Sequence, residues 1–336
     1  MDTKYKKTII YLIAIGAIII LILIKLIGLE DTIRTIKLAD KGLLVLAVLI
    51  QFVILGIRAF RWELLLKDRG EYVGLRYLYG IILIGSFANN VTPGARMGGE
   101  PLRAYLLKRN FGIKARKGFA TIVVERIYDF LILAVMAFIS YLYVISMVNI
   151  GGRSKLIITA LMAILILFLT GVANAIFSER IANKIFRYLP ERYKGGFMEA
   201  FSTFRKNSIN MIKNVSLFLT MAVVTTILWL LDVLRVLILF YSLDYSVSFL
   251  AITMVFTLTV FLSTLPFLPG GLGLSEGAMA GLYVAIGIPL VITVIVTILD
   301  RLIHYWLMIL CGGVAAMIVH IQDVDVSKIS SEMEGE

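Results

Sequence analysis

Two stretches of the chain place polar and charged residues between apolar segments. The first, NNVTPGARMGGEPLRAYLL, covers residues 89–107, and the second, PFLPGGLGLSEGAMAGLY, covers residues 266–283. Each stretch joins a Pro-Gly pair to a glutamate, Glu100 in the first and Glu276 in the second. Ionisable side chains are costly within a bilayer, and those that occur there generally serve a function. We therefore expect the two stretches to form the functional site.

The Pro-Gly pairs predict breaks in two helices. Proline removes a backbone donor, and glycine allows tight turns and close approach. The freed backbone groups must be buried in protein or line a wet cavity, because lipid cannot bind them. Half-helices that begin near Gly99 and Ser275 would direct positive dipole ends into that cavity, where they suit an anionic group such as a phosphate. The helix-breaking residues are Pro93, Gly94, Pro269, Gly270 and Gly271.

The charged residues of the two stretches suit a lipid headgroup. Arg96 and Arg103 could hold a phosphate, because a guanidinium matches its oxygens with two parallel hydrogen bonds. Glu100 and Glu276 could pair with those arginines, take up protons or bind a cationic headgroup. The candidate headgroup-binding residues are Asn89, Asn90, Arg96, Glu100, Arg103 and Glu276.

The two stretches indicate an internal repeat. Pro93-Gly94 aligns with Pro269-Gly270, and Glu100 aligns with Glu276, at an offset of 176 residues. Further along, Glu125-Arg126 aligns with Asp300-Arg301 after a gap of one residue, and Asp129 then falls opposite His304. We expect Arg126 and Arg301 each to reach the glutamate of a broken helix. These charged residues either stabilise the fold through ion pairs or take part in transport. They are Glu125, Arg126, Asp129, Asp300, Arg301 and His304.

The composition indicates that these two stretches belong to a membrane protein. Sixty per cent of residues are apolar, 16% are charged, and the mean hydropathy is +0.94, whereas soluble domains are about 45–50% apolar. The predicted fold is an all-α, multi-pass membrane protein with two re-entrant hairpins, at 76–107 and 248–286. Six full transmembrane helices are expected at about 8–28, 42–62, 118–147, 156–177, 214–241 and 288–320.

The net charge of +11 reports topology rather than nucleic-acid binding, because the basic residues concentrate in alternate loops. This pattern places both termini in the cytoplasm of a cell-membrane protein. Three crossings separate the hairpins, so the repeats, at about 76–147 and 248–320, would be inverted. We expect one transmembrane domain over 1–322 and a disordered acidic tail over 323–336. The basic segment 178–213 suits an interfacial amphipathic helix, with a solvated linker as the alternative.

Two further charged groups have simpler interpretations. Arg58, Arg61 and Trp62 end the second predicted helix, which suggests an interfacial anchor, although a headgroup contact is also open. Asp232 and Arg235 lie three residues apart towards the end of another helix, which suggests an interfacial ion pair.

Several chemistries find no support in the sequence. The motif G-x-x-x-x-G-K-[ST] is absent, and Gly271-Leu-Gly273 lacks the strand and helix of a dinucleotide-binding loop. Two histidines and one cysteine predict no metal site. We therefore expect no catalytic residue, no cofactor and no enzymatic activity.

At these motifs the chain resembles the flippase-like transmembrane region of lysylphosphatidylglycerol synthases, as a stand-alone member. The resemblance covers about residues 8–320. It rests on the Arg58–Trp62 helix end, Asn89-Asn90 with Pro93-Gly94 and Gly99-Glu100, Glu125-Arg126, and Pro269-Gly270-Gly271 with Gly273 and Glu276. It implies translocation of a phospholipid or a lipid-linked headgroup, with membrane lipids as partners, anionic or lipid-linked in the headgroup. The alternatives are a membrane-embedded transferase acting on a lipid-linked sugar and a non-catalytic partner of a lipid-modifying enzyme.

Overall fold

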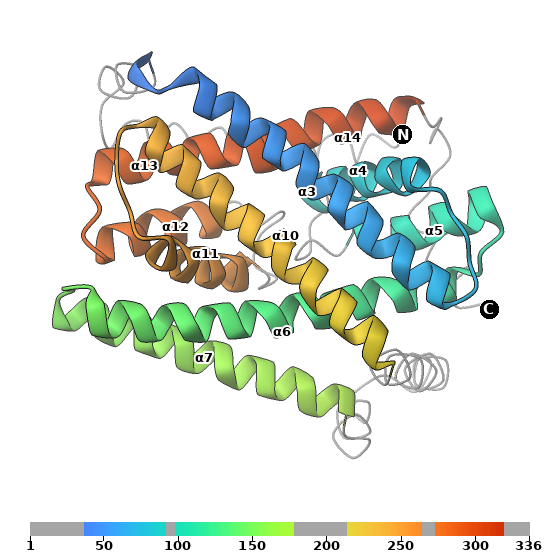
Figure 1. The fold of residues 1–336 in the computed structure, drawn as a ribbon, viewed down its shortest axis with the longest axis horizontal. Coiled ribbons are helices and arrows are strands. Elements are labelled where there is room, and N and C mark those ends of the chain that lie inside the picture. The colour runs from blue at the N-terminus through green and yellow to red at the C-terminus, as the bar shows by residue number, and fades with distance from the viewer. Residues whose placement is uncertain (1–36, 92–97, 178–213, 264–272, 319–336) are drawn as a thin grey trace.

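The computed structural model describes residues 37–91, 98–177, 214–263 and 273–318, and these ranges contain helices and turns but no strand (Figure 1). Within these described ranges, five helical segments are long and apolar enough to cross a membrane. They are α3 (Lys41–Asp68), α6 (Ala115–Met147), α7 (Gly152–Phe177), α10 (Val215–Ser242), and α13 (Leu290–Arg301) continuing through the π-helical turn η2 (Leu302–Trp306) into α14 (Leu307–Ile318). The predicted all-α, multi-pass fold is confirmed. The expected helix at 8–28, the segment 178–213 and the acidic tail lie outside the described residues.

Four shorter helices form the arms of the two predicted hairpins. They are α4 (Leu75–Val91) and α5 (Gly99–Phe111) in the first, and α11 (Phe249–Ser263) and α12 (Leu274–Ala285) in the second. Each is shorter than the roughly 20 residues that a crossing needs. The two arms of each hairpin pack against each other. The breaks between them, 92–97 and 264–272, hold Arg96 and all five predicted helix-breaking residues and lie outside the described residues.

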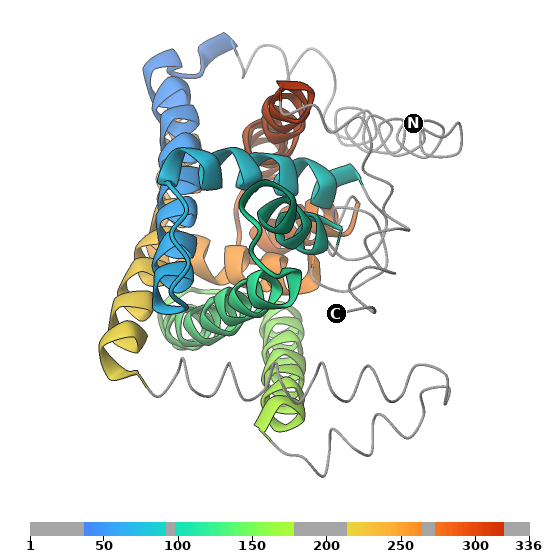
Figure 2. The ribbon, with the colours of Figure 1, turned by 90° about the vertical axis from the view of Figure 1, so that its right-hand side faces the viewer.

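Helices α3 and α10 form an antiparallel pair along one side of the molecule (Figures 1 and 2). At one end, the backbone N–H of Asp40 donates to the carbonyl of Ser242 over 2.8 Å. At the other end, the side-chain amide of Asn214 donates to Asp68 over 3.2 Å. Asp40 and Asn214 also cap the first turns of α3 and α10, so the contacts that start each helix lie beside those that join it to its partner.

The two hairpins open towards opposite ends of this pair. Lys117, at the start of α6, pairs over 2.7 Å with Glu71 in the loop before α4, so α4 begins and α5 ends near the end of α3. In the second hairpin, the ring of Tyr283 near the end of α12 packs on Phe240 near the end of α10. The long helix after each hairpin packs on the first arm of the other hairpin, α6 on α11 and α14 on α4.

Glycines allow the closest helix contacts. A Cβ on Gly312 of α14 would lie 2.4 Å from the backbone oxygen of Leu83 in α4. Within the first hairpin, a Cβ on Gly99 would lie 2.1 Å from the backbone oxygen of Gly85. Small residues at membrane helix interfaces allow such backbone approach and the dispersion contacts that come with it.

We predict that Gly312→Ala destabilises the protein by about 1–3 kcal/mol, because the added methyl group meets backbone that cannot rotate away. Gly313→Ala is the control, since its nearest neighbour is the Phe87 ring at 3.6 Å, an ordinary contact distance. Thermal unfolding of both variants in detergent measures the difference. Equal melting temperatures would show that the α4–α14 contact is looser than described.

Candidate functional site

Five helices line a cavity inside the helix bundle, and three of them, α3, α5 and α6, contribute charged side chains. The cavity has a volume of about 70 Å³, which holds several water molecules. We call it the arginine cavity. It is lined by Arg58, Arg61, Ile82, Gly85, Ser86, Asn89, Arg103, Glu125, Arg126, Asp129, Leu228 and Trp229.

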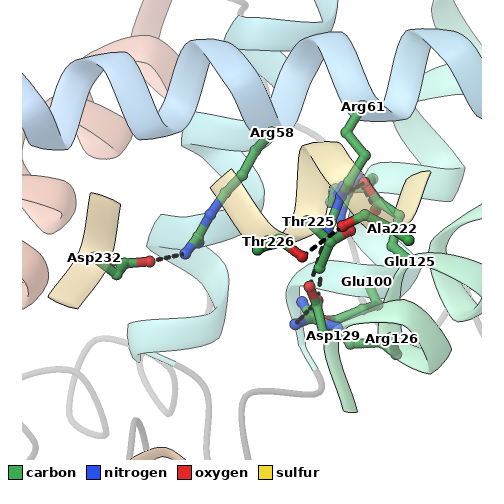
Figure 3. A network of polar contacts seen from close by, with 11 residues as sticks. Arg58, Arg61, Glu100, Glu125, Arg126, Asp129, Ala222, Thr225, Thr226 and Asp232 are labelled. Atoms are coloured by element: carbon green, nitrogen blue, oxygen red, sulfur yellow. Dashed lines mark hydrogen bonds and ion pairs between the residues drawn. The ribbon is translucent and has the colours of Figure 1, made fainter. Parts of the chain in front are cut away.

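Arg61 of α3 is the most extensively bound of these arginines (Figure 3). It donates to Asp129 over 2.6 Å and to the hydroxyl of Thr225 over 3.1 Å, and its Nε lies 3.5 Å from Glu125. Only 4% of Arg61 is exposed. Both acids come from α6, one turn apart, so a single guanidinium serves two carboxylates on one helix face.

Arg126 of α6 contacts the first hairpin. It donates to Glu100 over 2.7 Å and lies 3.4 Å from Asp129, which confirms the predicted reach to Glu100. Its side chain is 45% exposed. Asn89 joins the two arms of the hairpin, because its oxygen accepts from the N–H of Gly99 over 2.7 Å and its amide faces Glu100 at 3.4 Å.

Arg103 has a different partner from the one expected. It pairs with Glu125 over 2.7 Å rather than with Glu100, and its guanidinium stacks 4.0 Å above the Trp62 ring. Trp62 is fully buried and donates to Thr121 over 2.9 Å. The interpretation of Arg61 and Trp62 as an interfacial anchor is therefore wrong: both lie inside the bundle. The sequence signal was present, because a Trp beside an arginine also suits a buried cation–π contact.

A second cluster of charges surrounds the start of α12. Asp300 accepts from Arg301 over 3.3 Å and lies 2.9 Å from Arg235. Arg301 lies 3.9 Å from Glu276, so its predicted reach to that glutamate is confirmed. Glu276 also accepts from the N–H of Gly273 over 2.6 Å and so caps its own helix. Glu276, Arg235 and Asp300 are each at most 2% exposed.

Asp232 of α10 joins the two clusters. Arg58 donates to it over 3.2 Å (Figure 3). Arg235 lies 3.4 Å away from it. Arg235 also donates to Gln51. The predicted interfacial pair of Asp232 and Arg235 is wrong, because each is only 1% exposed. Asp232 lies roughly 15 Å along the helix from its end at 1.5 Å per residue, well within the membrane thickness.

The remaining predicted residues contribute in other ways. Asn90 is buried, and its backbone carbonyl accepts from the Tyr305 hydroxyl over 2.9 Å. His304 lies in η2, directly after the Asp300-Arg301 pair. Single π-helical turns are rare and occur often at functional sites, and this one had no recognised signal in the sequence. Sequence reasoning gave no central role to Arg58, Arg61, Asp232 or Arg235, and it missed Gln51 and Thr225.

The contacts of the two clusters occur in matched pairs. Arg61 with Glu125 corresponds to Arg235 with Asp300, at offsets of 174 and 175 residues. Arg126 with Glu100 corresponds to Arg301 with Glu276, at offsets of 175 and 176. The contact of Arg61 with Thr225 corresponds to that of Arg235 with Gln51. Arg61 aligns with Arg235, and Gln51 aligns with Thr225, each at an offset of 174 residues. Arg58 and Asp232 are themselves 174 residues apart. At this offset Arg58 aligns with Asp232, so the pair is its own counterpart.

A bundle of long and broken helices around buried ion pairs defines a multi-pass membrane protein with a polar interior. The model of the lysylphosphatidylglycerol synthase transmembrane region matches residues 9–312, and the chain belongs to that family. A UPF0104 membrane protein from Methanothermobacter thermautotrophicus is 30% identical, over 94% of this chain and 95% of that relative. One from Pyrococcus horikoshii is 30% identical, over 91% and 96%. The glycosyltransferase AglD of Haloferax volcanii is 33% identical over 99 residues, 30% of this chain and 16% of that protein.

We predict that Arg61→Met destabilises the protein by about 3–5 kcal/mol, because it leaves Glu125 and Asp129 without their shared guanidinium in the interior. Lys67→Met on the same helix is the control. Lys67 is 44% exposed and pairs with Glu63 over 3.1 Å, so its loss costs at most about 0.5 kcal/mol. Unfolding in detergent compares the two. A similar small loss for both variants would show that Arg61 is not needed to neutralise the two acids.

Proposed function

We propose that this chain moves a lipid with an anionic headgroup between the leaflets of its membrane. The observation that carries the proposal is the arginine cavity, where two guanidinium groups combine partial exposure with buried counter-charges. The side chain of Arg58 is 29% exposed and that of Arg126 is 45% exposed, while Asp232 and Asp129 behind them are buried. A phosphate that enters the cavity can accept hydrogen bonds from both arginines while its hydrocarbon chains stay in the bilayer.

The cavity's surroundings favour transport over static binding. The matched contacts and the two hairpins that open towards opposite ends support an inverted repeat, with α3 to α6 as one unit and α10 to α14 as the other. The antiparallel packing of α3 on α10 supports a pseudo-twofold axis near the Arg58–Asp232 pair, since this pair corresponds to itself. In transporters, inverted repeats allow one site to face either side of the membrane by an exchange of conformations between the two halves. The unit proposed here is longer than the repeat expected from sequence, because it includes α3 and α10.

The same arrangement supports an orientation for the protein. The contacts of Lys117 with Glu71 and of Asn214 with Asp68 place the loops around 69–74 and 112–114 at one end, next to the start of α10. These segments belong to the basic loops of the sequence, so we place this end in the cytoplasm. The first hairpin then opens to the cytoplasm and the second to the exterior.

We predict that cysteines at Lys114 and Ser246, in a Cys311→Ser background, react with a membrane-impermeant maleimide from opposite sides. Both positions are exposed and lie in loops next to the two different hairpins. Labelling of intact cells should modify position 246 only, and labelling of inverted vesicles should modify position 114 only. Modification of both positions from the same side would rule out the inverted arrangement.

A second candidate is action on a lipid-linked sugar. It is favoured by the local similarity to the glycosyltransferase AglD, which covers 30% of this chain. Such a substrate also carries phosphate groups, so the arginine cavity suits its headgroup as well. A transferase would change the sugar attached to the lipid, whereas a translocator returns the lipid unchanged. Mass analysis of lipids recovered from reconstituted vesicles distinguishes the two functions.

We predict that Arg58→Gln lowers the rate of lipid translocation at least about tenfold, a loss of roughly 1.4 kcal/mol of transition-state stabilisation. The measurement is the reduction by dithionite of fluorescent phosphatidylglycerol in vesicles that contain the purified protein. Arg153→Gln makes the same change at an exposed position before the apolar part of α7 and should translocate at the wild-type rate. If folded Arg58→Gln protein translocates as fast as Arg153→Gln protein, the assignment of the cavity fails.

A further inference from the structure

The connected ion pairs contain equal numbers of positive and negative side chains. Within the described residues, the arginines are Arg58, Arg61, Arg103, Arg126, Arg235 and Arg301, and the acids are Glu100, Glu125, Asp129, Asp232, Glu276 and Asp300. A buried network of this kind tolerates an added charge poorly, because the protein interior solvates it weakly. An anionic headgroup therefore needs a compensating positive charge when it enters.

The two clusters divide the charges unequally. Around the arginine cavity, four arginines face the three acids Glu100, Glu125 and Asp129. Around the start of α12, the two arginines Arg235 and Arg301 face the three acids Asp232, Glu276 and Asp300. The contact between Arg58 and Asp232 compensates both differences at once.

We propose that an anionic headgroup replaces Asp232 as the partner of Arg58. As this happens, the charged cluster around the start of α12, to which Asp232 belongs, takes up one proton. The inference rests on the proposed function and adds an energy source to it. Arg58 reaches into the cavity from α3, with its side chain 29% exposed, whereas the side chain of Asp232 is 1% exposed. The headgroup can thus reach the arginine, while the displaced carboxylate has no route to water without moving.

The surroundings of Asp232 explain why a proton is needed. Its second neighbour, Arg235 of the same helix, lies closer to Asp300 of α13, at 2.9 Å, than to Asp232, at 3.4 Å. Arg301 in turn is shared between Asp300 and Glu276. Without Arg58, three carboxylates share two guanidinium groups, and protonation of one restores neutrality.

The other titratable groups nearby do not remove this need. Asp129 of α6 is held by Arg61 and Arg126. Tyr283 of α12 lies near Asp300, and a tyrosine hydroxyl carries no charge at neutral pH. His304 lies on η2, one turn after Asp300. The proton is shared by the group of Asp232, Asp300, Glu276 and the neighbouring His304 as a whole, and Asp232 is the member that loses its partner.

The proposal is tested with the full-length protein in detergent, with dihexanoyl phosphatidylglycerol as the lipid and glycerophosphoglycerol, a phosphodiester of the same charge, as the same headgroup without chains. Calorimetry in two buffers of different ionisation enthalpy counts the protons taken up per lipid bound. We expect one proton per lipid at neutral pH, and an apparent Kd for the lipid that rises about tenfold per pH unit at alkaline pH. This count needs no variant.

Asp232→Asn mimics the protonated state. We expect it to bind phosphatidylglycerol without proton uptake, and at alkaline pH as tightly as the wild-type protein binds it at acid pH. Glu63→Gln is the matched control, because Glu63 pairs with Lys67 away from the cavity, and it should keep the wild-type pH dependence.

The outcomes separate this inference from the proposed function. Tight binding with no proton uptake and a constant Kd across pH would overturn the proton coupling and leave lipid binding intact. Absence of binding to phosphatidylglycerol would overturn both. Equal, proton-coupled binding of glycerophosphoglycerol would support the coupling and count against recognition of a lipid. Proton uptake that persists in Asp232→Asn would remove Asp232 from the mechanism.

Discussion

The absence of water inside a bilayer is the constraint on which this fold depends. An arginine or a carboxylate there is tolerated when an opposite charge meets it at hydrogen-bonding distance, and most of the pairs found here join different helices. Arg61 joins α3 to α6, Arg58 joins α3 to α10, and Arg235 joins α10 to α13. Apolar side chains cannot select such partners within a membrane, because lipid tails are as apolar as leucine. The ion pairs, together with close contacts at glycines, therefore specify which helices pack together.

The same pairs differ in their exposure between the two clusters. The side chain of Arg126 is 45% exposed, whereas that of its counterpart Arg301 is 8% exposed. Equivalent residues are thus accessible in one half and buried in the other. Under the proposed inverted repeat, this difference would mark one of two related conformations, and the other would exchange the two environments. Arg58 and Asp232 are 174 residues apart, so the proposed symmetry would exchange one for the other, and the pair would take part in both conformations.

The sequence predicted much of the fold, because its apolar segments are long and its Pro-Gly breaks are rare. The five described crossings and four hairpin arms fall near their expected positions, and the reach of Arg126 to Glu100 and of Arg301 to Glu276 followed from the repeat alone. The roles of Arg61, Asp232 and Arg235 did not follow. A charge in a long apolar helix gives no indication of its depth or its neighbours, and here the neighbours come from helices more than 60 residues away. Only the three-dimensional arrangement reveals such partners.

The structure also changes which groups can recognise an anion. Free N–H groups at the starts of α5 and α12 seemed suited to a phosphate, but Asn89 accepts from Gly99, and Glu276 accepts from Gly273. These protein oxygens satisfy one N–H at each helix start, and Glu276 adds a negative charge where the anion would have to bind. Recognition then depends on guanidinium groups that already have carboxylate partners. In the proposed mechanism, a headgroup replaces a carboxylate as the partner of an arginine, which costs less free energy than leaving that arginine without a counter-charge. The carboxylate that is displaced must then be neutralised, so headgroup binding is linked to its protonation. By the same proposal, such a site would couple charge movement to transport through the same contacts that hold the helices together.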